Sequence, residues 1–219
     1  MKLYKYKSYE EYKQVQISAN KSKINSSWVD TNSIGGLTRY IFEHNEDVKF
    51  GLCHGTRRGL EQQAFIDNFD FIGKTVEVIG TEISDTASTY PHTIEWDFHN
   101  VKKEWLGKVD FIYSNSLDQS YKPKECLDAW MSCLGNLGLC ILEWTWNHGD
   151  VHPPNKFCNG INCTHSGSKR DPFGATLKEY KSMIKEKYVL KDVLNNDPTK
   201  DDGETHRGER FFLVIENEI

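Results

Sequence analysis

Residues 48–59 read Val48-Lys-Phe-Gly-Leu-Cys-His-Gly-Thr-Arg-Arg-Gly59, an apolar run that ends in a turn containing glycine. The run predicts a buried strand, and the near-helical spacing of Leu60, Ala64 and Phe69 predicts a helix directly after the turn. A strand that opens into a helix gathers free backbone N–H groups at one point, and glycines let the backbone approach a ligand closely. The stretch therefore predicts an α/β fold that holds a nucleotide-type cofactor at this turn.

Short apolar runs alternate with helix-length amphipathic segments from residue 48 to the C-terminus. This alternation is typical of a largely parallel sheet with helices on both faces, and we predict a Rossmann-like sheet of seven strands. The last two strands are joined by a polar connector without a helical period, which favours an antiparallel hairpin at the C-terminus. The predicted strands are Val48 to Cys53, Thr75 to Gly80, Thr93 to Trp96, Val109 to Ser114, Leu137 to Glu143, Tyr188 to Leu194 and Arg210 to Glu216.

Helix starts are marked by capping residues and by proline. Ser8 with Glu11, and Thr176 with Glu179, have the spacing of a capping box, and Pro123 begins an amphipathic segment. We expect residues 1–45 to form a helical extension that packs as a lid on a single α/β domain, residues 46–219. That domain would contain an inserted loop at 147–174, where we expect substrate contacts because long loops in compact domains tend to be functional.

The composition and charge of the chain argue against several classes of function. The chain has 219 residues and a net charge of −5, which argues against a broad nucleic-acid surface. Its first residues lack an apolar leader and no run approaches the ~20 apolar residues of a membrane span, so we expect a cytoplasmic protein. The six cysteines are scattered, and the spacing of the His/Cys positions in the loop does not match structural zinc sites, so we predict no metal. Nothing in the sequence indicates an oligomeric state.

The strand pattern and the glycine turn resemble the class I S-adenosylmethionine-dependent methyltransferase family over roughly residues 35 to 219. The first turn of that family usually reads acidic-x-Gly-x-Gly-x-Gly. Here Gly55 and Gly59 match, whereas Cys53 stands at the acidic position and Arg57 at the middle glycine. The family's acidic residue lies near the amino group of the cofactor, and Glu61 is a candidate to replace it.

Further residues match the resemblance at the ends of later strands. It implies that Glu82 accepts hydrogen bonds from both ribose hydroxyls, as suits a carboxylate facing a vicinal diol. Asp97 resembles the aspartate that receives the adenine amino group, with Trp96 or Phe98 against the purine ring. Asn115, at the end of the fourth predicted strand, would border the methyl-transfer site. His54, inside the turn, would also lie near the cofactor.

Methyl transfer is an in-line displacement at carbon in which positioning supplies most of the rate, and a general base matters only when the acceptor must lose a proton. We predict a hydroxyl of a small-molecule or carbohydrate-like acceptor. His148 and Asp118 are the candidate bases, and His148 is favoured because a free imidazole titrates near ~6.5. Trp144 and Trp146 would form a wall for the acceptor, although core packing is an equally good interpretation for one of them.

Two functions of other classes stay open at this point. One is a NAD-dependent Rossmann oxidoreductase, and the other is a nucleotide-binding module without catalysis. A dinucleotide site favours a complete Gly-x-Gly-x-x-Gly, which the turn from Gly55 to Gly59 does not supply. The predicted terminal hairpin also favours the methyltransferase.

Overall fold

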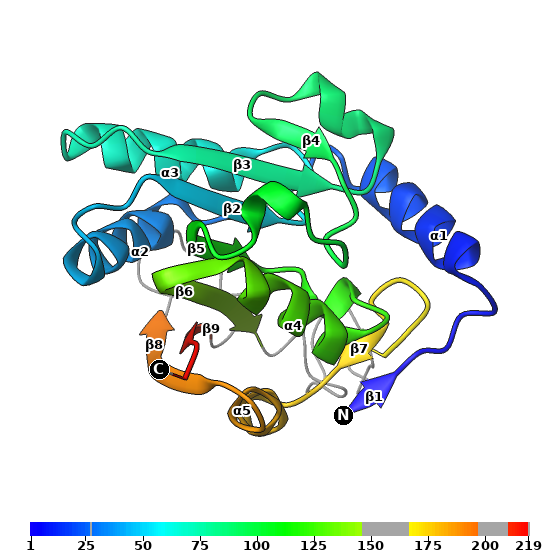
Figure 1. Ribbon diagram of the computed structural model, residues 1–219. Helices are drawn as coiled ribbons and strands as arrows, with labels where there is room; N and C mark the ends of the chain where they lie inside the picture. Colours follow the sequence, from blue (N-terminus) through cyan, green and yellow to red (C-terminus); the bar gives the residue numbers. More distant parts are fainter. Residues whose placement is uncertain (27, 146–166, 197–209, 219) are drawn as a thin grey trace.

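The computed structural model describes residues 1–26, 28–145, 167–196 and 210–218. Within them, a seven-stranded sheet has the order β4-β3-β2-β5-β6-β9-β8 (Figure 1). Strands β4, β3, β2, β5 and β6 are parallel, and β9 runs antiparallel between β6 and β8, which confirms the predicted sheet and hairpin. The strands are β2 (Phe50–His54), β3 (Glu77–Glu82), β4 (Thr93–Glu95), β5 (Val109–Ser114), β6 (Leu134–Thr145), β8 (Val189–Asn196) and β9 (Arg210–Glu216).

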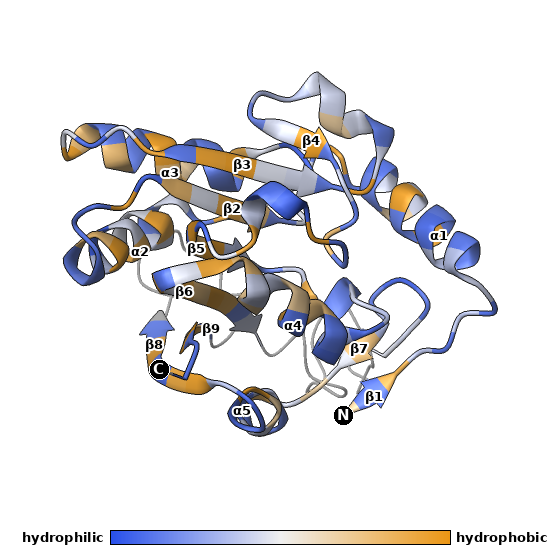
Figure 2. Cartoon of the chain, viewed as in Figure 1, coloured by the Kyte–Doolittle hydropathy of each residue, from blue (hydrophilic) through white to orange (hydrophobic). Residues whose placement is uncertain are grey.

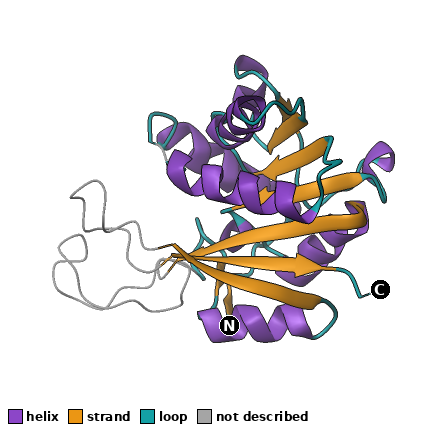
Figure 3. Ribbon diagram, turned by 90° about the vertical axis from the view of Figure 1, so that its left-hand side faces the viewer, coloured by secondary structure: helices purple, strands orange, loops and turns teal. Residues whose placement is uncertain are grey.

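Helices cover both faces of the sheet, as predicted (Figures 1 and 3). One face carries α2 (Thr31–His44) and α3 (Leu60–Phe71), and the other carries α4 (Pro123–Cys133) and α5 (Leu177–Lys185). The crossovers on either side of β4 contain only short 3-10 turns, η1 (Asp85–Thr89) and η2 (Lys103–Trp105).

The core follows the two-residue period of the strands. Adjacent residues of one strand point to opposite faces, so that Cys53 and Phe111 pack under α2 and α3, whereas Leu52 and Ile112 pack under α4 and α5. Figure 2 shows the hydrophobic colour gathered on these central strands. A sheet buried on both faces explains why the sequence shows continuous apolar runs.

The first long strand starts later than the sequence predicts. Strand β2 begins at Phe50. At this point the Asp110 carboxylate, at the start of β5, accepts hydrogen bonds from the backbone N–H groups of Lys49 (2.8 Å) and Phe50 (2.9 Å). Strand β3 is also shifted by two residues, so that Glu82 is its last residue rather than a loop residue.

The N-terminal segment closes the carboxyl edge of the sheet. Helix α1 (Tyr9–Ser22) begins at its predicted cap, Ser8, and lies across the end of the sheet to which β3 and β4 point (Figure 1). Strand β1 (Lys2–Leu3) pairs with β7 (Phe173–Gly174), which ties this arm to a distant part of the chain. Among the described residues, no helix is both long enough and apolar enough to cross a bilayer.

Candidate cofactor site

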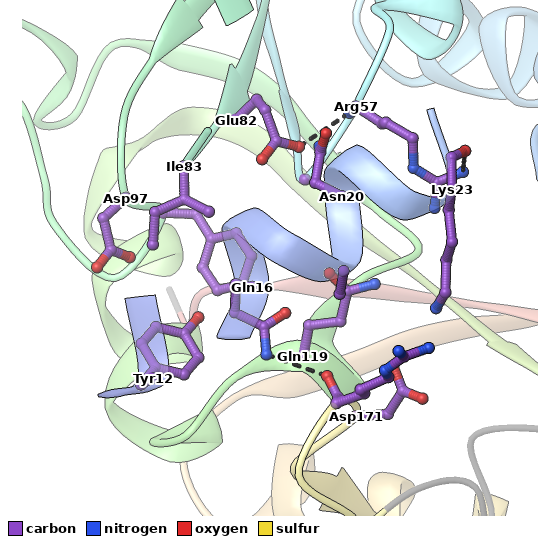
Figure 4. Close-up of a pocket in the computed structure, with 14 residues that line it drawn as sticks. Tyr12, Gln16, Asn20, Lys23, Arg57, Glu82, Ile83, Asp97, Gln119 and Asp171 are labelled. Atoms are coloured by element: carbon purple, nitrogen blue, oxygen red, sulfur yellow. Dashed lines mark hydrogen bonds between the residues drawn. The ribbon is translucent and has the colours of Figure 1, made fainter. Parts of the chain in front are cut away.

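A pocket lies between the carboxyl edge of the sheet and the inner face of α1 (Figure 4). One side comes from the glycine turn, the ends of β3 and β4 and Gln119, and the opposite side comes from α1 and the segment before β7. The lining residues are Tyr12, Gln16, Ala19, Asn20, Lys23, Gly55, Arg57, Glu82, Ile83, Asp97, Phe98, Gln119, Arg170 and Asp171.

The glycine turn has a conformation that only some residues adopt easily. Gly55 and Gly59 have φ angles of 76° and 77°, in the left-handed region that glycine favours. A Cβ atom on Gly55 would lie 2.7 Å from the Ser116 hydroxyl oxygen, so the turn and the end of β5 approach one another closely. The N–H of Gly55 donates to the carbonyl of Thr81 (2.9 Å), which holds the turn beside β3.

Glu82 is buried at the end of β3 and faces the pocket (Figure 4). Its two carboxylate oxygens accept hydrogen bonds from the backbone N–H groups of Ser84 (3.0 Å) and Arg57 (3.2 Å). Burial raises its pKa, and the hydrogen bonds, including one from Asn20, oppose this shift. Each carboxylate oxygen accepts more than one hydrogen bond, so Glu82 keeps capacity for a ligand that carries two hydroxyls.

Asp97 is held in place by His99. The Oδ1 atom of Asp97 lies 2.6 Å from Nδ1 of His99 and accepts from the His99 backbone N–H (3.0 Å). On its other side, the His99 ring lies 2.8 Å from the Ser120 hydroxyl, and the Tyr9 hydroxyl donates to Oδ2 of Asp97 (2.7 Å). Although burial raises the pKa of Asp97, the hydrogen bond and charge of His99 bring it below the usual value. The side chain is therefore an ionised acceptor at neutral pH.

The residues that α1 contributes to the pocket were not predicted from the sequence. Tyr12, Gln16 and Asn20 are the buried residues of α1, and their four-residue spacing places them on one face of the helix. Gln16 donates to the carbonyl of Arg170 (3.0 Å), which joins the helix to the segment before β7. The signal in the sequence was weak, because a buried helix face with two amides does not differ in pattern from a solvated face.

Four of the predicted cofactor residues line this pocket, namely Gly55, Glu82, Asp97 and Phe98. Cys53 and His54 do not. Cys53 belongs to the core under α2 and α3, where burial raises the pKa of its thiol. The His54 ring stacks on Trp130, with centroids 4.8 Å apart, and burial lowers its pKa to about 3. His54 is thus a neutral core residue.

Gly59, Glu61 and Asn115 are not among the residues that line the pocket. Gly59 is the N-cap of α3, and Glu61 is buried in the first turn of that helix. The Asn115 amide donates to Oε1 of Glu61 (3.2 Å), so the two residues hold the start of α3 against the end of β5. Burial raises the pKa of Glu61 to about 7, and the hydrogen bond from Asn115 opposes the shift.

Only some of the residues predicted to contact the acceptor belong to the part of the chain that the structure describes. Asp118 is buried in η3 (Leu117–Gln119), next to the lining residue Gln119, and burial raises its pKa well above the usual value. Trp144 is a core residue whose indole N–H donates to the carbonyl of Ala175 (3.0 Å), so core packing is the interpretation that holds for it. His148, Trp146 and most of the predicted loop 147–174 lie outside the described residues. In the described ranges, no group of three metal-ligating side chains comes together.

A second polar cluster lies at the end of β6, and no sequence motif predicts it. Arg210, fully buried, pairs across strands with Thr145, and its Nε atom lies 3.2 Å from Glu143. Glu143 also accepts from the Tyr113 hydroxyl (2.7 Å) and from the Trp28 indole (2.9 Å). The cluster joins the chain before α2 to the centre of the sheet.

Comparisons with known proteins match the fold of this chain but not its sequence. No family model and no curated protein matches the sequence. The structure of 1,6-didemethyltoxoflavin-N1-methyltransferase from Burkholderia thailandensis, with bound 1,6-didemethyltoxoflavin and S-adenosylhomocysteine, matches with a TM-score of 0.68 at 11% identity, over 98% of this chain and 92% of that chain. The N-methyltransferase NodS from Bradyrhizobium japonicum WM9, in complex with S-adenosylhomocysteine, matches with a TM-score of 0.59 at 9% identity, over 93% and 99%.

A third match is an S-adenosylmethionine-dependent methyltransferase from Clostridium acetobutylicum, with a TM-score of 0.59 at 12% identity over 92% of this chain and 98% of that chain. At such identities the likeness concerns the backbone and not the side chains of a site. The strand order and the antiparallel β9 agree with it. The chain therefore has the fold of the class I S-adenosylmethionine-dependent methyltransferases.

Proposed function

We propose that this protein is an S-adenosylmethionine-dependent methyltransferase. The observation that carries the proposal is that Glu82, Asp97 and Gly55, from three separate places in the sequence, line one pocket at the carboxyl edge of the sheet. Ligands of open α/β sheets bind at that edge. Two carboxylates beside a glycine turn suit an adenosine with a free ribose diol and an exocyclic amino group.

The polar groups of the pocket match the parts of such a cofactor one by one. Glu82 is the acceptor for the ribose hydroxyls, and the ionised Asp97 is the acceptor for the adenine amino group. Ile83 and Phe98 supply apolar surface for the purine ring. A dinucleotide would also need a place for a pyrophosphate, and the turn lacks the complete glycine pattern that serves one.

The methionine end of the cofactor carries a carboxylate and an ammonium group. Lys23, just after α1, extends its side chain along the pocket wall (Figure 4), and we assign it to the carboxylate. For the ammonium group, Glu61 remains the candidate behind the turn, and an approaching positive charge would favour its ionised form. Cys53 contributes no charge in this assignment.

The acceptor is proposed to be a hydroxyl of a small molecule. The bound cofactor supplies a methyl group on a sulfonium, and the protein's main task is to hold the acceptor oxygen in line with it. Asp118 lies in η3, just after β5, and burial raises its pKa, which makes its ionised carboxylate a stronger base for the hydroxyl proton. His148 stays a second candidate for that base.

The binding test uses thermal unfolding with S-adenosylhomocysteine and, separately, with NAD. Ligand at a hundred times its dissociation constant stabilises a protein by about 2.7 kcal/mol, or roughly 5 to 10 °C here. We expect that shift with S-adenosylhomocysteine, and at most about half of it in Glu82→Gln and Asp97→Asn at the same ligand concentration. Glu95→Gln, an exposed position on β4, is the matched control. A shift with NAD alone would favour the oxidoreductase instead.

A further inference from the structure

Arg57 occupies a backbone conformation that its side chain makes costly. Its φ angle is 49°, in the left-handed region, and the only other described non-glycine residue with a positive φ is His92. Such conformations persist in folded proteins when surrounding interactions hold them, and they cluster at ligand sites. Arg57 stands between Gly55 and Gly59 in the turn, where a third glycine would adopt the same angle freely.

The arginine side chain provides contacts that a glycine would lack. Its Nη1 atom donates to the backbone carbonyls of Lys23 (3.2 Å) and Ser26 (2.9 Å), which lie just beyond the last residue of α1. Carbonyls at the C-terminal end of a helix carry partial negative charge and lack partners within the helix, so a guanidinium is well suited to them. One side chain thus connects the cofactor turn to the end of the lid helix.

The main chain of Arg57 makes a third contact, because its N–H donates to Glu82 (3.2 Å). The residue therefore bridges the proposed ribose acceptor and the end of α1 that carries Asn20 and Lys23, both of which line the pocket. Figure 4 shows Arg57, Asn20 and Lys23 grouped on one side of the pocket. At the same end of the helix, Lys21 forms an ion pair with Asp85. Both side chains are exposed, and exposed ion pairs contribute little to stability.

The other end of α1 is held differently. Tyr6, before the helix, donates to the carbonyl of Lys169 (2.6 Å), and Gln16 donates to the carbonyl of Arg170 (3.0 Å). These contacts fasten the N-terminal half of the arm to the segment before β7. At the C-terminal end, the buried Asn20 hydrogen-bonds Glu82 and accepts from the Thr86 hydroxyl (3.3 Å). Arg57 adds the two hydrogen bonds to the backbone carbonyls that follow the helix, and so fastens the end of the helix itself.

We propose that Arg57 is a positioning residue that fastens the C-terminal end of α1 over the cofactor pocket, and that this role explains why arginine stands where a glycine would fit the backbone better. The inference rests on the proposed function for its effect on the cofactor. Its structural half, the attachment of the lid, does not depend on which ligand the pocket binds.

The test compares Arg57→Gly with Arg39→Ala, which removes an arginine from the exposed face of α2. In Arg57→Gly the backbone is relaxed and the lid contacts are lost. We expect S-adenosylhomocysteine to bind roughly tenfold more weakly by calorimetry, while the melting temperature without ligand stays close to that of the wild type. Trypsin should cut after Lys21 and Lys23 faster than in the wild type, because the end of α1 opens locally.

Arg57→Lys provides a second variant with the charge and the backbone angle retained. A single ammonium group lacks the planar donor array of a guanidinium, so we expect an affinity between those of the wild type and Arg57→Gly. Wild-type affinity and wild-type cleavage in Arg57→Gly would overturn the proposal, and so would a general loss of stability with cleavage at all sites. If the wild type bound no S-adenosylhomocysteine, the proposed function would fail, and the cleavage rates would still decide whether Arg57 holds the lid.

Discussion

Glu61 illustrates how burial changes a single carboxyl group in this protein. It lies in the first turn of α3, is almost fully buried, and accepts a hydrogen bond from Asn115. Burial raises its pKa from 4.5 to about 7, because water that would stabilise the charge has been removed. Between those two values the folded protein keeps a proton that the unfolded chain has released. The contribution of Glu61 to stability is therefore complete below pH 4.5 and declines as the pH rises towards 7.

Glu61→Gln tests this directly, because the amide keeps an oxygen for Asn115 and cannot ionise. At pH 4 the free energy of unfolding should be close to that of the wild type. At pH 8 the variant should be more stable by about 3 kcal/mol, because the wild type must then hold an ionised Glu61 in a buried place. Urea unfolding of both proteins across this range gives the difference. A difference that does not change with pH would contradict the raised pKa.

Arg210 and Glu143 form an ion pair. Here, in contrast to Glu61, we expect the loss of either charged side chain to lower the free energy of unfolding, since both charges are buried and depend on one another. Both side chains are almost completely shielded from water. Removing Arg210 leaves the Glu143 charge buried without its ion partner, and removing Glu143 leaves Arg210 with the more distant carboxylate of Asp30, 3.8 Å from Nη1. The loss of one partner of a buried pair costs roughly 3 to 5 kcal/mol. We expect Glu143→Ala and Arg210→Met each to lose about this much in urea unfolding, and the double variant to lose less than the sum. Additive losses would show that the two side chains are not coupled.

At the scale of elements, helix α2 forms from residues that favour a helix only weakly. Gly35 and Gly36 stand in its middle, after Asn32 and Ser33, and these residue types have low helix propensity. The helix forms nevertheless because Ile34, Leu37 and Ile41 are buried against the sheet, and because Asp30 caps its N-terminus. Tertiary packing outweighs local propensity here.

The two glycines of α2 differ in their surroundings, which provides a matched pair of variants. A Cβ atom on Gly36 would meet nothing within 4 Å, whereas one on Gly35 would lie 3.0 Å from the Asn68 side chain. Gly36→Ala should therefore stabilise the protein by roughly 0.5 to 1 kcal/mol, and Gly35→Ala should gain less. Thermal unfolding measures both. An equal gain for the two variants would mean that Asn68 moves aside freely.

At the scale of the whole molecule, the sequence predicts the order of the strands but not the residues of α1 that line the pocket. Strands β5 and β9 have the predicted bounds because apolar runs buried on both faces end abruptly at polar residues. Glu82 and Asp97 were predictable because strand ends carry ligand groups in this architecture. Lys23 and Gln16 had no motif, since their place over the pocket depends on the pairing of β1 with β7 and on the contacts of Arg57.

We propose that the pocket under α1 binds the adenosine part of S-adenosylmethionine through Glu82 and Asp97. The most direct measurement is a calorimetric titration of the wild-type protein with S-adenosylhomocysteine, repeated on Asp97→Asn. We predict binding of one ligand per chain by the wild type, and an affinity at least tenfold lower in the variant, about 1.4 kcal/mol. Wild-type binding that Asp97→Asn leaves unchanged, or no binding by the wild type, would contradict the claim.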